Sequence, residues 1–110
     1  MGPQQIQLAL DAKFNALSDV TRRTLVERLS RGQASVKELA RPIPMSLPTV
    51  LKHLAILERG GIVQSEKRGR VRTYRMAPNA FTDMERWVAG RKETWTQALH
   101  RLGEFPASRP

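Results

Sequence analysis

Residues 35–61 read SVKELARPIPMSLPTVLKHLAILERGG, and this stretch decides the fold. It opens with Ser35 and, three residues later, Glu38, the pair of a capping box, in which each side chain accepts a hydrogen bond from a free amide at a helix start. Pro42 and Pro44 end that helix, because proline lacks the amide hydrogen that a helix interior needs. The stretch therefore begins with one short helix.

A longer helix follows the two prolines. Ser46 is a good N-cap for it, and Pro48 is tolerated in the first turn, where the missing amide would be unpaired in any case. Gly60-Gly61 stops this helix near Arg59. A short capped helix, a proline-bearing turn and a longer capped helix are the layout of a helix-turn-helix, which we assign to residues 35–59.

The next residues predict a β-hairpin. β-prone residues run from Ile62 to Arg68 and from Val71 to Met76, and Gly69-Arg70 between them is typical of a type II′ turn. A hairpin directly after such a unit is a wing, here residues 63–76. Its cations suit phosphates or a groove, the alternative being an edge strand protected by charge. They are Lys67, Arg68, Arg70, Arg72 and Arg75, with Glu66 as the one acid close to them.

Further helices are predicted on both sides of this unit. One covers residues 5–17, a second is capped by Ser18 or Asp19 and ends near Ser30, and a long one covers residues 80–102. The fold class is therefore mainly α with a small β-hairpin. It is a winged helix-turn-helix of about five helices and a two-stranded wing.

The chain has 110 residues, the length of one domain, which we expect over residues 1–105 with a frayed tail over residues 106–110. It has no cysteine, which excludes disulfides, thiolate metal sites and thiol redox sensing. It shows neither a signal-peptide pattern nor an apolar segment of membrane-spanning length. We therefore expect a cytoplasmic, nucleoid-associated protein without a membrane partner.

The chain is strongly basic: 19 Lys and Arg against 10 Asp and Glu give a formal charge of +9. Such an excess favours a polyanionic partner, because neutralised phosphates release condensed counterions. A well-solvated basic surface is the alternative. The cations of the wing favour double-stranded DNA as the partner.

The helix after Ser46 is amphipathic. At about 100° per residue, Val50, Leu54 and Leu57 share one side and are expected in the core. The small and basic outer side suits a major groove, where the residues at the helix start meet base edges. An ordinary amphipathic helix of a small bundle is the alternative. The predicted DNA contacts of this helix and the wing are Ser46, Leu47, Pro48, Thr49, Leu51, Lys52, His53, Arg68, Arg70 and Arg72.

Three stretches resemble repressors of the ArsR/SmtB type. Residues 17–23, Leu-Ser-Asp-Val-Thr-Arg-Arg, are similar to the opening of the family's second helix, residues 45–54 to its reading helix, and residues 69–74 to its wing. The resemblance covers residues 12–76 well and the final helix more loosely. It implies a homodimer that binds an inverted-repeat operator and represses transcription by occupying a promoter.

The reading helix departs from the family pattern at Leu47 and Leu51, where members often carry polar residues that face bases. Leucine makes no bidentate hydrogen bond but contacts a thymine methyl group, so we expect half-sites read partly through thymines and partly through DNA shape. Core packing is the alternative for Leu51. His53 is interpreted as a hydrogen-bonding residue at the core edge or as a phosphate contact. Arg22 and Arg23 are interpreted as phosphate contacts or as ion-pair partners.

The metal-sensing motifs of the family are missing from the sequence. Residues 35–40 contain no thiol, and Asp83, Glu85, His100 and Glu104 do not reproduce the family's histidine spacing. We expect no metal site and no cofactor, and the chain resembles the autorepressor-like branch. A ligand- or metal-responsive repressor of the same fold is the alternative, and the effector is left open.

The final helix carries an apolar stripe at three- and four-residue spacing, which includes both tryptophans of the chain. Exposed tryptophan is costly, and aromatic side chains are typical of interface centres. Packing within the monomer is the alternative for each tryptophan. The predicted dimer residues of the first and the final helix are Ile6, Leu8, Phe14, Trp87, Arg91, Trp95, Leu99 and Leu102.

Other function classes fit the sequence less well. It has no Ser/His/Asp set, carboxylate pair or glycine-rich phosphate loop, so we expect no enzyme. A winged-helix module that binds protein would have a neutral wing. RNA binding would need exposed aromatic residues on a sheet, where Tyr74 stands alone and suits the core. We therefore expect a DNA-binding transcriptional repressor.

Overall fold

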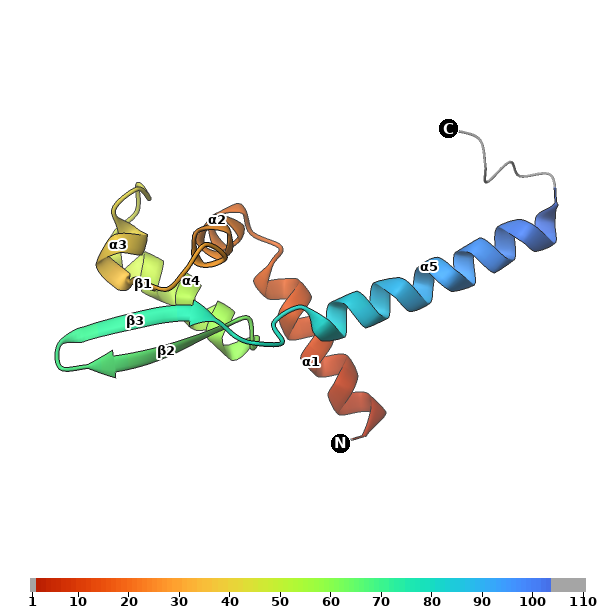
Figure 1. Cartoon of the computed structure of the whole chain (residues 1–110), viewed down its shortest axis with the longest axis horizontal. Coiled ribbons are helices and arrows are strands. Elements are labelled where there is room, and N and C mark those ends of the chain that lie inside the picture. The colour runs from red at the N-terminus through yellow and green to blue at the C-terminus, as the bar shows by residue number, and fades with distance from the viewer. Residues whose placement is uncertain (1, 104–110) are drawn as a thin grey trace. The chain divides into compact units, whose positions relative to one another are not determined.

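The computed structural model describes residues 2–103, which fall into two compact units, the first ending at Ala80 and the second beginning at Phe81. The single domain expected over residues 1–105 stays a prediction, and the tail expected over residues 106–110 lies outside the described residues. The elements in chain order are α1 (Pro3–Ala16), α2 (Val20–Leu29), β1 (Ala34–Ser35), α3 (Val36–Ala40), α4 (Leu47–Arg59), β2 (Val63–Arg68), β3 (Val71–Met76) and α5 (Thr82–Leu102) (Figure 1).

The helix-turn-helix begins at the predicted caps. In the capping box of α3, the Glu38 amide donates to Ser35 Oγ at 3.2 Å and the Ser35 amide donates to Glu38 Oε1 at 2.9 Å. At the start of α4, the Thr49 amide donates to Ser46 Oγ at 3.4 Å. Each cap involves residues within one turn, which is why the sequence predicts both helix starts.

The starts of the other helices differ slightly from expectation. α1 begins at Pro3, two residues earlier, because proline fits the first helical position. α5 begins at Thr82, two residues later than predicted. Of the two predicted caps of α2, Asp19 is the one used, since its Oδ2 accepts a hydrogen bond from the Arg22 amide at 3.1 Å.

The sheet has three strands in the order β1-β3-β2, where a two-stranded wing was predicted. The hairpin itself is as expected, with β2 and β3 antiparallel and Lys67 opposite Arg72. Gly69 has φ +63° and Arg70 does not have positive φ, as a type II′ turn requires. The strand that the prediction missed is β1, which pairs Ala34 with Tyr74. Two residues show no alternation in a sequence, so only long-range pairing reveals them.

The core of the first unit lies where α2, α3 and α4 pack against the sheet (Figure 1). Val50, Leu54 and Leu57 of α4 are fully buried, which confirms the predicted core side of this helix. Tyr74 is buried as well, as expected. Complete burial of one such apolar side chain contributes about 1.5–3 kcal/mol. The largest fully buried side chains are Leu25, Leu39, Val50, Leu54, Leu57, Ile62 and Val63.

α1 packs closely on the end of α4. A Cβ at Gly60 would lie 3.1 Å from the carbonyl oxygen of Ala12 and 3.3 Å from Ala16 Cβ, so the two backbones meet without a side chain between them. Lys13 is buried beside this contact, and its Nζ donates to the carbonyl oxygens of Gly61 at 3.3 Å and Ala80 at 3.1 Å. The lysine therefore connects α1 to the exit of α4 and to the end of the first unit.

In the second unit, α5 is one helix of 21 residues. The Arg91 guanidinium carbon lies 5.3 Å from the centre of the Trp87 ring, the distance of a cation–π contact. Both residues belong to the predicted stripe, so the Arg91 cation lies over part of the apolar surface of that stripe.

Candidate nucleic-acid interface

The outer side of α4 is open to solvent. Leu47 is 46% exposed and Leu51 is 37% exposed, so the core alternative for Leu51 is wrong. Pro48 and Lys52 are exposed as well. This surface offers apolar contacts and one cation to a groove, and few donors or acceptors to base edges.

The hydroxyls at the start of α4 are occupied with each other. Ser46 Oγ and Thr49 Oγ1 lie 2.9 Å apart and share a hydrogen bond, while Ser46 Oγ also accepts from the Thr49 amide. These contacts hold the first turn of the helix in shape. They leave Ser46 and Thr49 with less hydrogen-bonding capacity for a base than their residue types suggest.

His53 lies at the edge of the core and is tied to Arg22. The side chain of His53 is 17% exposed, and its Nδ1 lies 3.1 Å from Arg22 Nη1 and 3.8 Å from Asp19 Oδ2. This matches the interpretation of His53 as a hydrogen-bonding residue at the core edge. Arg22 is buried, at 8% exposure. Its interpretation as a phosphate contact is therefore wrong, because its guanidinium donates hydrogen bonds to the carbonyls of Asn15 and Ala16 and contacts His53 Nδ1.

The carboxylates that cap α2 and α3 stay ionised more readily than ordinary ones. A hydrogen bond from the Arg22 amide is the main cause that lowers the pKa of Asp19. Hydrogen bonds from the Ser35 amide and then the Ser35 hydroxyl lower the pKa of Glu38 in the same way. Each carboxylate thus serves a helix start in its charged form.

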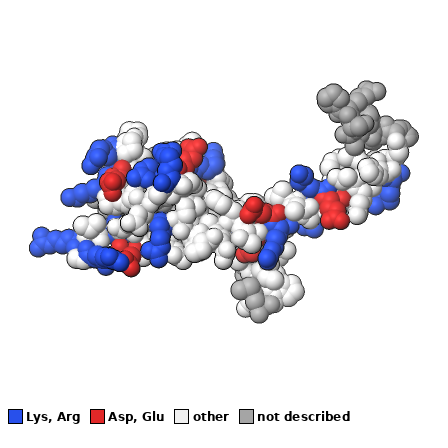
Figure 2. All heavy atoms as spheres, in the orientation of Figure 1, with Lys and Arg blue, Asp and Glu red and all other residues white. Residues whose placement is uncertain are grey.

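The hairpin presents cations without partners. Lys67, Arg70 and Arg75 are exposed, and within residues 2–103 their side chains have no hydrogen bond or ion pair. Arg68 Nε contacts Glu66 Oε1 at 2.7 Å, an exposed pair that stabilises little. Figure 2 shows Lys and Arg gathered at the end of the first unit that carries the hairpin turn. This surface suits a chain of phosphates.

Arg72 has a different position from the other predicted wing contacts. It is half-buried, and its Nη1 donates to Ser65 Oγ at 2.8 Å. Ser65 Oγ in turn donates to Glu58 Oε2 at 2.9 Å, in the last turn of α4. The chain of hydrogen bonds joins the hairpin to the reading helix. Sequence reasoning missed Ser65 and Glu58, although strand alternation places Ser65 on the same face as Arg72.

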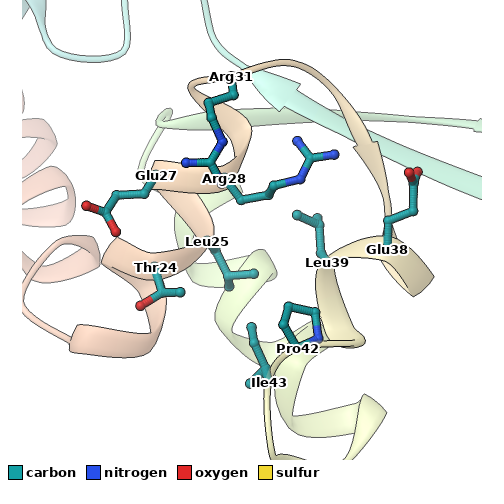
Figure 3. A pocket seen from close by; sticks show the side chains of 9 residues that line it. All are labelled: Thr24, Leu25, Glu27, Arg28, Arg31, Glu38, Leu39, Pro42 and Ile43. Carbon is teal, nitrogen blue, oxygen red and sulfur yellow. The ribbon is translucent and has the colours of Figure 1, made fainter.

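A cavity of about 280 Å³ lies between α2 and α3 (Figure 3). Leu25, Leu39, Pro42 and Ile43 give it an apolar lining. Its charged residues are two arginines and two glutamates, so charge selects neither an anionic nor a cationic ligand. They are Glu27, Arg28, Arg31 and Glu38.

The predicted dimer residues are mostly exposed in their own units. In α1 the buried residues are Leu10, Lys13 and Ala16, whereas the predicted set Ile6, Leu8 and Phe14 is exposed. In α5, Trp95 is 61% exposed, Trp87, Arg91 and Leu102 are exposed, and Leu99 is half-buried. Large apolar side chains in such positions are typical of a surface that a partner covers.

Among residues 2–103, no group of three or more His, Cys, Asp or Glu side chains is placed to hold a metal ion. None of the helices there has the length and apolar character needed to cross a membrane.

Comparison with known proteins gives the family. The pattern described as Helix-turn-helix domain matches residues 17–66. The HTH-type transcriptional regulator Rv2034 of Mycobacterium tuberculosis is 39% identical over 93 residues, 81% of this chain and 80% of that protein. The transcriptional repressor SdpR of Bacillus subtilis is 27% identical over 75 residues, 68% of this chain and 83% of that protein.

A solved structure agrees with these relatives in fold. The crystal structure of the ArsR family transcriptional regulator RHA00566 is 44% identical, covers 82% of this chain and 93% of its own, and superposes with a TM-score of 0.79. The helix-turn-helix, the wing and the resemblance of residues 12–76 point the same way. The chain is no enzyme and belongs to the ArsR family of winged helix-turn-helix, DNA-binding transcriptional repressors.

Proposed function

We propose that the protein is a homodimeric repressor that binds an inverted-repeat operator. One observation carries the proposal: an open α4 surface lies in the same unit as a hairpin whose Lys67, Arg70 and Arg75 have no partner among the described residues. Cations so close together repel one another unless a polyanion lies against them. A duplex that receives α4 in its major groove supplies that polyanion beside the wing.

In this proposal the two surfaces have different tasks. Leu47 and Leu51 contact thymine methyl groups, and Lys52 contacts a phosphate. Arg68 and Arg70 lie along the backbone or a neighbouring minor groove, while Arg72 holds the hairpin in position through Ser65. Affinity thus comes mainly from charge, and specificity comes from methyl contacts, DNA shape and the spacing of two half-sites.

Dimerisation completes the reading of an inverted repeat. The exposed apolar residues of α1 and α5 are the proposed contact between two copies, each of which reads one half-site. Two tethered reading helices bind far more tightly than one, because the second contact is made at high effective concentration. The repressor then occupies its promoter as a pair of chains.

The experiment removes only methyl groups from the DNA. Footprinting of the protein on the DNA upstream of its own gene defines the half-sites, and uracil then replaces each thymine under the footprint. We expect the affinity of the native protein to fall about fourfold for each methyl group that a leucine contacts. In a double variant, Leu47→Ala with Leu51→Ala, the same replacement has no effect.

Two controls make the result decisive. Uracil at thymines outside the footprint leaves both affinities unchanged, and the double variant on the same substituted site controls for a change in DNA stiffness. Half-sites without any thymine under the protection, or an equal response of the native protein and the double variant, contradict the methyl-reading role of the two leucines. A native protein that protects no DNA at all contradicts the operator itself.

A further inference from the structure

We propose that buried Arg22 holds His53 as a neutral imidazole with its proton on Nε2, and that this N–H donates a hydrogen bond to a DNA phosphate beside α4. The second half of the proposal rests on the proposed function, whereas the protonation state of the ring does not. His53 is then a neutral contact to DNA, and Arg22 is its positioning residue.

The contacts of Arg22 determine which nitrogen of His53 carries the proton. Arg22 Nε donates to the Ala16 carbonyl at 2.7 Å and Nη2 donates to the Asn15 carbonyl at 3.1 Å. Nη1 lies 3.1 Å from His53 Nδ1. A guanidinium is always protonated and accepts no hydrogen bond, so Nδ1 must be the acceptor. A ring whose Nδ1 accepts carries its proton on Nε2.

The other ring nitrogen is not fully buried. Within residues 2–103, Nε2 of His53 has no hydrogen-bond partner, and no buried polar side-chain atom lacks one. The Nε2 atom is therefore not buried. His53 follows Lys52 on α4 and shares the helix with the proposed groove contacts, so an N–H at this position suits a phosphate at the edge of that groove.

The charged groups around the ring are few. Arg22 and Asp19 face it from α2, and α1 brings only the carbonyls of Asn15 and Ala16 to this junction. Among the described residues, Asp19 is the only carboxylate within 4.0 Å of His53. Protonation of Nδ1 would set one N–H against another and break the hydrogen bond to Arg22. The neutral ring is the form that satisfies the buried guanidinium.

Two substitutions separate the two nitrogens. His53→Asn keeps a polar atom near the position of Nδ1 and loses the outer donor, whereas His53→Gln keeps a donor near the position of Nε2 and loses the inner acceptor. We expect His53→Asn to keep its thermal midpoint and lose about tenfold in operator affinity. We expect His53→Gln to lose less operator affinity than His53→Asn and to unfold at a lower temperature.

The salt dependence of binding identifies the contact as a neutral one. The slope of log affinity against log salt should be the same for His53→Asn and the native protein, while Lys52→Ala lowers its magnitude by about 1. Nitrogen-15 spectra of the imidazole should show a protonated Nε2 and an unprotonated Nδ1.

Several results would overturn the inference. Spectra with a proton on Nδ1 would show a charged or differently protonated ring. If the native protein binds its operator and His53→Asn binds it equally well, the proposed phosphate contact is wrong, whereas the proposed operator stands. Failure of the native protein to bind would instead reject the proposed function, and the spectra would still decide the protonation state.

Discussion

At the scale of single residues, the unusual feature of the first unit is that two cations are buried away from carboxylates. Lys13 and Arg22 donate to backbone carbonyls, and within residues 2–103 no carboxylate oxygen lies within 4.0 Å of their side-chain nitrogens. A carbonyl that accepts from a charged group gains a stronger hydrogen bond than one that accepts from a neutral donor. The two side chains thus replace salt bridges as the polar links between α1 and the helix-turn-helix.

Arg22→Met tests how much such a link contributes to the free energy of unfolding. The change leaves the Ala16 and Asn15 carbonyls and the His53 ring without their donor, so we expect a loss of about 2–4 kcal/mol in the free energy of unfolding. The measurement is the urea midpoint at unchanged slope. Arg23→Met is the matched control, because Arg23 is exposed and donates once, to the Leu17 carbonyl at 2.7 Å. Equal losses in the two variants would contradict the role given to burial.

The sequence could not predict these two links. A lysine or arginine in a helix is normally solvated, and only the position of Lys13 between Leu10 and Ala16 on the buried side of α1 hints at burial. The acceptors are carbonyls, which every residue has, so no pattern of residue types marks them. For Leu47 and Leu51, helical spacing gives a flank position and leaves core packing open for Leu51, and both side chains lie exposed.

At the scale of elements, helix starts were predictable and the third strand was not. The caps at Ser35 and Ser46 use atoms within one turn of the chain, so their residue types suffice to place the helices. β1 exists only because Ala34 and Ser35 meet β3, which lies far along the chain. The connection of Arg72 through Ser65 to α4 could not be predicted from the sequence for the same reason, since it depends on how two elements pack.

Because of the two capping carboxylates, the stability of the protein is expected to depend on pH in the acid range. Folding lowers the pKa of Asp19 from 3.8 and that of Glu38 from 4.5. A lowered pKa gives stability that is present above the unfolded value and is lost as the pH falls through the folded value. Asp19→Asn and Glu38→Gln keep a polar cap without the charge. Each should be less stable than the native protein at pH 7, with a difference that shrinks below about pH 4.

Urea midpoints at neutral pH and at about pH 3 check this expectation. Glu93→Gln serves as the control, because Glu93 lies exposed in the middle of α5, away from either cap. A difference between each capping variant and the native protein that stays constant from neutral to acid pH would contradict a contribution from the charge.

The contact between α1 and α4 leaves no room for a methyl group. Gly60→Ala would bring Cβ to 3.1 Å from the Ala12 carbonyl oxygen, a backbone atom that moves only with its helix. We expect a loss of about 1–3 kcal/mol in the free energy of unfolding. Gly90→Ala makes the same change inside α5 with no neighbour within 4 Å, and there it should stabilise by about 0.5–1 kcal/mol. Thermal midpoints compare the two, and a stabilised Gly60→Ala would show that α1 does not pack as described.

At the scale of the whole molecule, the net charge and the exposed apolar surface each fit a different kind of partner. The net charge of +9 fits DNA, whereas the exposed apolar side chains of α1 and α5 are typical of a surface that another protein chain covers. The reading unit was the most predictable part, because caps, turn glycine and cations all mark it in the sequence. The proposed contact between two copies is the least predictable, since a stripe of apolar residues does not say what covers it.

Trp95→Glu tests whether a second copy of the chain covers this apolar surface. Trp95 is 61% exposed in its unit, and a charge there would leave a carboxylate buried without a partner in a dimer. We expect a monomer by sedimentation and operator affinity reduced by about 10²–10⁴, because one half-site is then read at a time. Gln97→Glu is the matched control, since Gln97 is exposed, is not part of the stripe and gains the same charge. Its oligomeric state and affinity should stay near the native ones, and a Trp95→Glu protein that remains a dimer would place the subunit contact on another surface.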